Sequence, residues 1–327
     1  MAGLFRILYE GAFNLFETPM RWLQYSLGAH RIAWVFLLPN LLIFGLFTYL
    51  PIALNVWYAS TSGDRILIAD RDWVGGANFA TLLDCGSYLD PNTCRRDLFW
   101  RAVHNTGWFV VLQVGFMILL SLVAALILNR NIPLKGFFRS VFFYPVLLSP
   151  VVVALIWKWI LQRNGVLNAG LDWAGLPTTN WLLDPSWAFF WIVFVSIWAN
   201  MGFYVLILLA GLQSIPSDVY EAAEMDGTPA WRSLFRITLP LLTPTLLVVM
   251  VLSLIRAVQA FDEIYVLTGG GPGSATTLLI QYIYDVGFAT RPRQFGLAAA
   301  ASLLMAGVLM VLTLLQLAAT RKRAEEG

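Results

Sequence analysis

Two groups of polar residues stand out within otherwise apolar stretches of this sequence. Arg256, Gln259 and Glu263 follow one another at spacings of three and four, which would place them on one face of a helix. Asn200 and Tyr204 lie about one helical turn apart in another apolar stretch. Polar side chains at membrane depth are costly unless they face a bundle interior or a water-filled cavity, so both groups are candidates for lining the path of a polar solute. Hydrogen-bonding side chains beside aromatic faces suit the hydroxyls and C–H surfaces of a sugar.

Chemistry of other kinds has little support in the sequence. The two histidines and two cysteines form no metal-ligand pattern, and no set of acid, base and nucleophile has a telling spacing. The phosphate-binding pattern G-x-x-x-x-G-K-[ST] does not occur, and the glycine-rich run at 269–273 contains no lysine. We therefore expect a chain that is not an enzyme and that holds no metal or cofactor of its own.

The composition is typical of a membrane protein. Of 327 residues, 59% are hydrophobic and only 12% are charged, whereas a soluble domain carries roughly 25% charged residues. The 14 tryptophans suit a protein with two membrane interfaces to line. A net charge of +2 provides no broad basic field for binding nucleic acid. These features predict an all-α integral membrane protein.

Six stretches are long enough and sufficiently free of charge to cross a hydrocarbon core of about 30 Å as helices. They lie at 32–63, 105–129, 140–157, 185–217, 237–255 and 294–320. Prolines within them require neighbouring helices to satisfy freed carbonyl groups, which favours a packed bundle. A seventh apolar stretch, 264–284, is cut by a Gly-Pro-rich run, so we predict an irregular loop there, followed by a short amphipathic helix near 277–286.

Basic residues near the span ends set the predicted orientation. The loop after the second span holds Arg130, Lys135 and Arg139 without an acid, and the tail has three basic residues at 321–323, so both are expected on the cytoplasmic side. Six spans then place both termini in the cytoplasm, whereas a seven-span alternative would put the tail outside. The predicted domains are an interfacial N-terminal segment (1–31), a transmembrane domain (32–320) with an external loop (60–104), and a cytoplasmic tail (321–327).

The only two cysteines, Cys85 and Cys94, lie in the predicted external loop. An even pair in one polar loop outside the cytoplasm could form a disulfide. Two free thiols are the alternative, and the sequence does not decide between them.

The predicted cytoplasmic loop between the fourth and fifth spans, 217–240, has the caps of two short helices. Asp218 followed three residues later by Glu221 has the spacing of a capping box. Gly227 can take the left-handed conformation that ends a helix, and Thr228 before a proline favours the start of a second one. A stiff helix-turn-helix of this kind suits a contact that transmits motion better than it suits a simple connector.

The same loop resembles the EAA loop of the inner-membrane permease subunits of binding-protein-dependent ABC importers. The consensus is matched at Glu221-Ala222-Ala223, at Gly227 and at Ile237-x-Leu239-Pro240, with gaps of three and nine residues. A second block, FDEIYVLTGGGP from Phe261 to Pro272, is similar to the segment after the fifth core span in carbohydrate permeases of the maltose and glycerol-phosphate type. Within that type it is similar to the larger maltose subunit. The resemblance covers 32–321 and is thin in the external loop.

This resemblance implies a coupling role for the loop. In that family the first helix docks in a cleft of a cytoplasmic ATPase subunit, and ATP-driven closure of the ATPase dimer rocks the permease pair between inward-facing and outward-facing states. The coupling residues so implied are Glu221, Ala222, Ala223, Asp226, Gly227, Ile237, Leu239 and Pro240. The implied partners are a second permease subunit, two ATPase subunits that bind ATP–Mg, and an external solute-binding protein, in the inner membrane of a bacterium or archaeon.

The resemblance also implies residues along the substrate path. The contacts of the maltose-type permease fall at Asn200, Met201, Tyr204, Ser253, Arg256, Ala257 and Ala260, and Gln259 joins them by its position. Two alanines replace amide side chains and an arginine replaces an aromatic ring, so a sugar or polyol other than maltose is expected. Arg256 could favour an anionic sugar or a sugar phosphate, or could pair with Asp262 or Glu263. An ion-coupled secondary transporter, which would need intramembrane carboxylates, is the alternative from another class.

Overall fold

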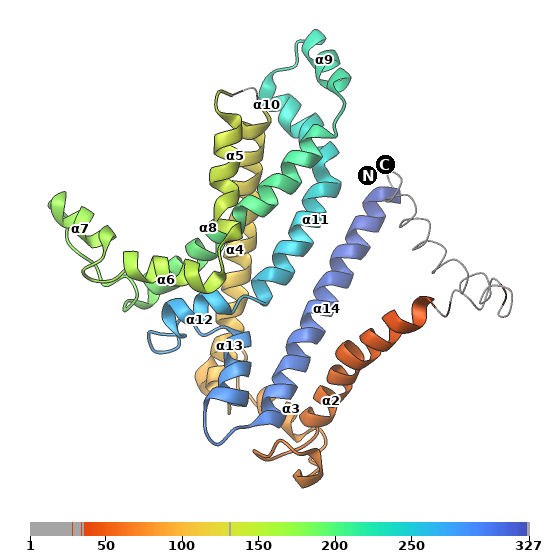
Figure 1. Cartoon of the computed structure of the whole chain (residues 1–327), viewed down its shortest axis with the longest axis vertical. Coiled ribbons are helices and arrows are strands. Elements are labelled where there is room, and N and C mark those ends of the chain that lie inside the picture. The colour runs from red at the N-terminus through yellow and green to blue at the C-terminus, as the bar shows by residue number, and fades with distance from the viewer. Residues whose placement is uncertain (1–27, 29–33, 35, 131, 326–327) are drawn as a thin grey trace, which may run out of the picture. The chain divides into compact units, whose positions relative to one another are not determined.

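The computed structural model describes residues 28, 34, 36–130 and 132–325, and these residues are helical apart from loops and two isolated bridges (Figure 1). Apart from Gly28, the predicted N-terminal segment lies outside the described residues, as do the last two residues of the predicted tail. The chain divides into two compact units, Met1–Trp57 and Tyr58–Gly327. In the described part of the first unit, an apolar helix begins at Phe36 and contains a π-helical turn, η1 (Gly45–Tyr49).

Five described helices are long and apolar enough to cross a membrane, and a bent pair of helices could supply a sixth span. The prediction of six spans therefore holds in number when the bent pair counts as one. The five long helices are Phe36–Ala59, α4 (Asp97–Asn129), α8 (Pro185–Gln213), Ala230–Val258 and Phe295–Ala318. The first of these ends with α2 (Leu50–Ala59), the fourth ends with α11 (Leu239–Val258), and the fifth is part of α14 (Phe295–Glu325).

The third predicted span, 140–157, is wrong as one straight helix. The chain runs through α5 (Lys135–Phe143) and a 3₁₀ turn, η4 (Tyr144–Leu147), and α6 (Pro150–Ile160) then leaves at an angle of 102°. Ser149, with ψ 138°, is extended, as the residue before a proline prefers to be. Pro150 occupies the first turn of α6, where its missing N–H costs no helical hydrogen bond. The proline thus starts a new helix at the bend, and a short helix, α7 (Val166–Trp173), follows it.

Helices α4, α6, α8 and α11 of the second unit share one apolar core, whose largest buried side chains include Phe109, Met117 and Tyr204. A glycine allows the closest backbone approach in this core. A Cβ atom on Gly202 of α8 would lie 2.1 Å from the carbonyl oxygen of Phe142 on α5. Only a residue without a side chain lets these two helices meet in this way.

A second apolar cluster joins α3 (Ala77–Leu83), the start of α4, α13 (Leu279–Tyr284) and the start of α14. After α11 the chain forms α12 (Asp262–Thr268), an irregular glycine-rich segment, α13 and a π-helical turn, η6 (Asp285–Ala289). The predicted loop and short helix are therefore present, with the additional helix α12 before the loop.

The segment predicted as the external loop is held together by polar contacts and a covalent link. The structure joins Cys85 to Cys94 by a disulfide. Arg71 is buried, and its guanidinium donates to the side chain of Thr61 at 2.8 Å and to the carbonyl oxygen of Gly63 at 3.0 Å. Burial lowers the pKa of Arg71 from its ordinary value. This arginine therefore stabilises the fold of the loop, which also contains two 3₁₀ turns, η2 (Ile68–Asp70) and η3 (Pro91–Thr93).

Candidate functional site

The loop with the EAA pattern forms a helix, a turn and a second helix beyond the ends of α8 and α11 (Figure 1). These elements are α9 (Ser217–Met225), α10 (Ala230–Ser233) and a π-helical turn, η5 (Leu234–Thr238), that leads into α11. The predicted capping box is wrong, because Pro216 is the N-cap of α9 and no side chain caps the helix. Asp218 instead lies in the first turn, where its negative charge still complements the helix dipole.

The turn between α9 and α10 is a compact helix stop centred on Gly227. Its φ of 67° is the left-handed conformation predicted for it, which glycine adopts without steric cost. The amide of Gly227 donates to the carbonyl oxygen of Glu224 at 2.9 Å, and the amide of Thr228 donates to that of Ala223 at 2.9 Å. This pair of bonds is the Schellman arrangement. The second helix begins at Ala230, two residues after Thr228, because the extended Pro229 caps it.

The surface of this segment combines charged and apolar side chains. Glu221, Ala222 and Asp226 are exposed, whereas Ala223 is buried. Three large apolar residues are also exposed, at 89%, 63% and 62%: Met225, Trp231 and Phe235. The remaining residues of the motif, Ile237, Leu239 and Pro240, belong to the helical continuation into α11.

A contact across the segment holds α9 against the helix that leads into α11. The hydroxyl of Tyr220 lies 3.1 Å from Oγ1 of Thr238, and either oxygen can be the donor. Together with the helix stop at Gly227, this contact fixes the angle between the two helices.

The second unit also contains a polar cavity of about 420 Å³. Its walls come from α4, from the bend between η4 and α6, from α8, and from the junction of α11 with α12. It is lined by Gln113, Pro145, Val146, Leu148, Pro150, Val153, Ser196, Ala199, Asn200, Arg256, Gln259, Ala260, Phe261, Asp262 and Glu263.

The cavity contains half of the residues predicted for the substrate path. Those that line it are Asn200, Arg256, Gln259 and Ala260. The other four are outside its lining: Met201, Tyr204, Ser253 and Ala257. The last three of these are buried in the helix packing, and Met201 lines a separate apolar groove.

The single helical face proposed for the polar residues after position 253 is wrong. The helix α11 ends at Val258, Gln259 is its C-cap, and Glu263 belongs to α12. The cavity nevertheless brings Arg256, Gln259 and Glu263 together, because the chain turns at Gln259 and continues along the same wall.

A chain of hydrogen bonds at the cavity wall connects three helices. Nε2 of Gln113 on α4 donates to Oγ of Ser196 on α8 at 3.3 Å, and that hydroxyl donates to Oε1 of Glu263 at 3.2 Å. A serine hydroxyl has one proton, and Ser196 uses it in the hydrogen bond to Glu263. The same oxygen therefore acts only as an acceptor toward the Gln113 amide. Sequence reasoning missed Gln113 and Ser196, although each is a polar residue in a charge-free span, which is the signal used for the other residues.

Comparison with known proteins defines the family. Residues 117–324 match the family described as the binding-protein-dependent transport system inner membrane component. The chain belongs to this family. The trehalose/maltose permease protein MalF of Thermococcus litoralis is 34% identical over 90% of this chain and 95% of that protein. The lactose permease protein LacF of Rhizobium radiobacter is 32% identical over 89% and 94% of the two chains. The sulfoquinovosyl glycerol permease protein SmoG of Agrobacterium fabrum is 33% identical over 81% and 82%.

A solved structure of a related transporter agrees with the fold of this permease. A chain of a bacterial ABC transporter that imports the acidic polysaccharide alginate superposes with a TM-score of 0.76 and 27% identity, over 92% of this chain and 98% of that one. A second structure of the alginate transporter, with a periplasmic protein that carries an alginate pentasaccharide, gives a TM-score of 0.73 over 90% and 95% of the two chains. The sequence relatives are named as permease proteins of transport systems, and the solved structures are of an ABC transporter.

The charges in the cavity of this permease are one guanidinium and two carboxylates. Burial raises the pKa of Glu263, which lies beyond the end of the fifth span, and hydrogen bonds to its carboxylate, including the one from Ser196, oppose that rise. Arg256 is exposed and forms no ion pair with Asp262 or Glu263, so the pairing considered from the sequence does not form. The described residues contain no group of three His, Cys, Asp or Glu side chains that could hold a metal ion.

Proposed function

We propose that the chain is the permease subunit of an ABC importer that moves a sugar or related polyol across the inner membrane of a bacterium or archaeon. The observation that carries this proposal is the helix-turn-helix of α9 and α10, which has the EAA pattern and projects beyond the bundle. Its partners would be a second permease, two ATPase subunits that bind ATP–Mg, and an external solute-binding protein.

The exposed surface of α9 and α10 suits a protein contact. Glu221 offers a carboxylate that a cationic ATPase side chain could bind, and the small exposed Ala222 permits a close approach. The exposed Trp231 and Phe235 add apolar area of the kind found at the centres of protein interfaces. The fixed angle at Gly227 would let movement of α9 pass to α11 as a rigid-body displacement.

The cavity suits a hydroxylated solute. Asn200 and Gln259 offer both donors and acceptors, and Phe261 offers an aromatic face for a sugar ring. Because the cavity holds two carboxylates and one guanidinium, a neutral sugar is favoured over an anionic one. The names of the relatives MalF and LacF support the same class of solute.

Reconstitution tests the proposal. The permease is purified with its partner subunits, placed in liposomes and supplied with the cognate binding protein, whose ligands are first screened by calorimetry against neutral sugars, polyols and sugar acids. Uptake is expected to require ATP and to persist when proton and sodium gradients are collapsed. Uptake that an ion gradient drives without ATP would instead support a secondary transporter.

An anionic sugar is the second candidate, because the guanidinium of Arg256 lies in the cavity and forms no ion pair with a described carboxylate. The name of SmoG and the alginate transporter add weight to this candidate. Replacement Arg256→Gln decides between the two: it should leave the uptake of a neutral sugar within a few-fold of the parent and should abolish the uptake of a sugar acid.

A further inference from the structure

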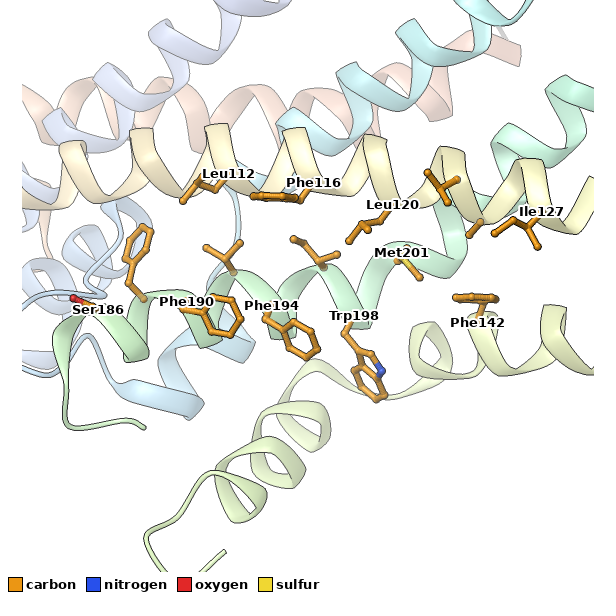
Figure 2. Close-up of a pocket in the computed structure, with 15 residues that line it drawn as sticks. Leu112, Phe116, Leu120, Ile127, Phe142, Ser186, Phe190, Phe194, Trp198 and Met201 are labelled. Carbon is orange, nitrogen blue, oxygen red and sulfur yellow. The ribbon is translucent and has the colours of Figure 1, made fainter. Parts of the chain in front are cut away.

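An apolar groove runs along the second unit between α4 and α8, separate from the polar cavity. Its volume is about 690 Å³. In Figure 2, Leu112, Phe116 and Leu120 lie on the side of α4 that faces α8, and the rings of Phe190 and Phe194 line the groove from the side of α8 that is turned away from α4 in this view. Phe116, Leu120, Phe190 and Phe194 are all exposed, so no other described element of the second unit covers the groove. An open apolar groove at membrane depth must be covered by lipid or by another protein.

The groove is long enough for an acyl chain. Along α4 its lining extends from Leu112 to Ile127, which at 1.5 Å per residue is about 22 Å. One leaflet contributes about half of a hydrocarbon core of roughly 30 Å. A lipid chain that starts at one end of the groove could therefore lie in it along the depth of its leaflet.

One end of the groove is strongly basic. Ile127, the last lining residue of α4, lies three positions before Arg130, and Phe142 of α5, which lines the same end, lies three positions after Arg139. Arg139 and Phe142 are three apart on α5 and therefore share a face of that helix. Arg130 is the extended C-cap of α4, and its amide donates to the carbonyl oxygen of Ile127 at 3.2 Å, which keeps its backbone at the same end of the groove. Lys135 at the start of α5 adds a third positive charge.

These positive charges have no acidic neighbours in the sequence. The chain contains no aspartate or glutamate between Asp97 and Asp172, a stretch that includes all of α4 after its first turn and all of α5. Asp184, the N-cap of α8, belongs to the opposite end of the groove, where Ser186 lines it. The acids of α9, which follows the other end of α8, form no ion pair with the three cations in the described part of the chain. The buried Nε of Arg139 also has no hydrogen-bond partner. Among the residues that the structure describes, the three cations at the basic end form no ion pair, and Nε of Arg139 is an unused donor.

We propose that this groove binds an anionic phospholipid, with its phosphate at Arg130, Lys135 and Arg139 and one acyl chain between α4 and α8. Charge complementarity selects this occupant over a helix of the second permease, because an apolar helix would leave the three cations unpaired. Basic pockets beside transmembrane helices suit anionic headgroups in this way. The proposal does not depend on which solute the transporter carries.

Photolabelling in nanodiscs tests the site on the complete transporter. Two probes carry the same photoreactive diazirine acyl chain, one as phosphatidylglycerol and one as phosphatidylcholine. The labelled peptides are mapped by mass spectrometry. Phosphatidylglycerol is expected to label the groove peptides of α4 and α8 at least fivefold more than phosphatidylcholine, since each basic residue contributes a factor of roughly five.

Two test variants, each with a matched control, separate the contribution of the headgroup from that of the groove. The double replacement Arg130→Gln with Arg139→Gln should bring the two lipids to equal labelling, whereas Arg163→Gln, beyond the end of α6, should not. Leu120→Trp should fill the groove and remove the label, while Leu119→Trp, its exposed neighbour that does not line the groove, should retain it. Each variant is first checked for an intact complex by size-exclusion chromatography.

Two results would overturn the proposal. One is equal labelling by both lipids in the parent, or a preference for phosphatidylglycerol that survives the double arginine replacement. The other is an unlabelled groove in the parent together with cross-linking from Leu120→Cys to the second permease, which would make the groove a protein interface.

Discussion

Ser196 on α8 donates a hydrogen bond of 3.2 Å to Glu263 on α12, although 67 positions separate them in the chain. Ser196 is 1% exposed, and Gln113, which donates to it from α4, is 2% exposed. Breaking such a buried chain leaves a polar group unsatisfied, which costs about 1–3 kcal/mol. The contact therefore ties the segment after the fifth span to the centre of the bundle at the wall of the cavity.

Glu263 should make the stability of the protein dependent on pH. Because burial raises the pKa of Glu263, the folded protein keeps this proton to a higher pH than the unfolded chain does. Stability should therefore fall as the pH rises from the ordinary pKa of about 4.3 through the raised one. Glu263→Gln should flatten this part of the profile, measured as melting temperature in detergent from about pH 4 to 8. The matched variant Asp262→Asn, at an exposed neighbour, should keep the parental slope, and equal slopes in both variants would refute the role.

The left-handed turn at Gly227 should be required for coupling. Gly227→Pro fixes φ near −65° and removes the amide that donates to Glu224, so the angle between α9 and α10 should change. The variant should insert normally but lose most substrate-stimulated ATP hydrolysis and uptake. Gly227→Asn is the control, because asparagine tolerates the left-handed conformation, and it should keep most of both activities. Equal activity in the proline variant would show that the turn is only a connector.

The charge of Glu221 should matter more than its size. Glu221 is exposed, so Glu221→Lys should not alter the stability of the permease by more than about 0.5 kcal/mol. It should nevertheless weaken association with the ATPase subunits about tenfold or more, because a like charge would face the expected cation. Co-purification and ATP hydrolysis measure this effect. Glu224→Lys, an exposed charge reversal on the same helix but outside the motif, is the control, and identical losses in both variants would indicate a nonspecific effect of charge.

The disulfide between Cys85 and Cys94 should stabilise the loop that contains it. Replacing both cysteines with serine should cost about 2–4 kcal/mol of local stability, which limited proteolysis of residues 60–104 would detect as faster cleavage. The parent should show no maleimide-reactive thiol before reduction and two after it. Two reactive thiols in the unreduced protein, purified from membranes without reductant, would contradict the pairing.

The approach of α8 to α5 should tolerate no side chain at Gly202. Gly202→Ala would place a Cβ 2.1 Å from the carbonyl oxygen of Phe142, and this backbone atom cannot move without shifting α5. We expect a loss of at least about 1–3 kcal/mol, seen as a lower melting temperature. Gly115→Ala is the matched control, since Gly115 is also helical, has no atom within 4 Å of its ideal Cβ, and gains helix propensity. A Gly202→Ala protein as stable as the control would contradict this packing.

Local sequence signals predicted the spans other than the bent third one, and the helix-turn-helix, because each signal acts over a few residues. A run of some twenty apolar residues must be helical in a membrane, whatever it packs against. The stop at Gly227 depends on one glycine, and the amides that complete it belong to its neighbours in the chain. The exact helix starts were less accurate, since Pro216 and Pro229 took the cap positions expected for Asp218 and Thr228.

The sequence by itself determined that this is a helical membrane protein with a helix-turn-helix between its fourth and fifth spans, because hydropathy and helix-stop signals are properties of short stretches. Only the tertiary structure decided that the third span bends by 102° and that Gln113, Ser196 and Glu263 form one chain of hydrogen bonds. A proline shows where a helix can break, but packing sets the angle at which the next helix leaves. A contact between residues on different helices depends on the rotation and depth of each helix, which no local pattern contains.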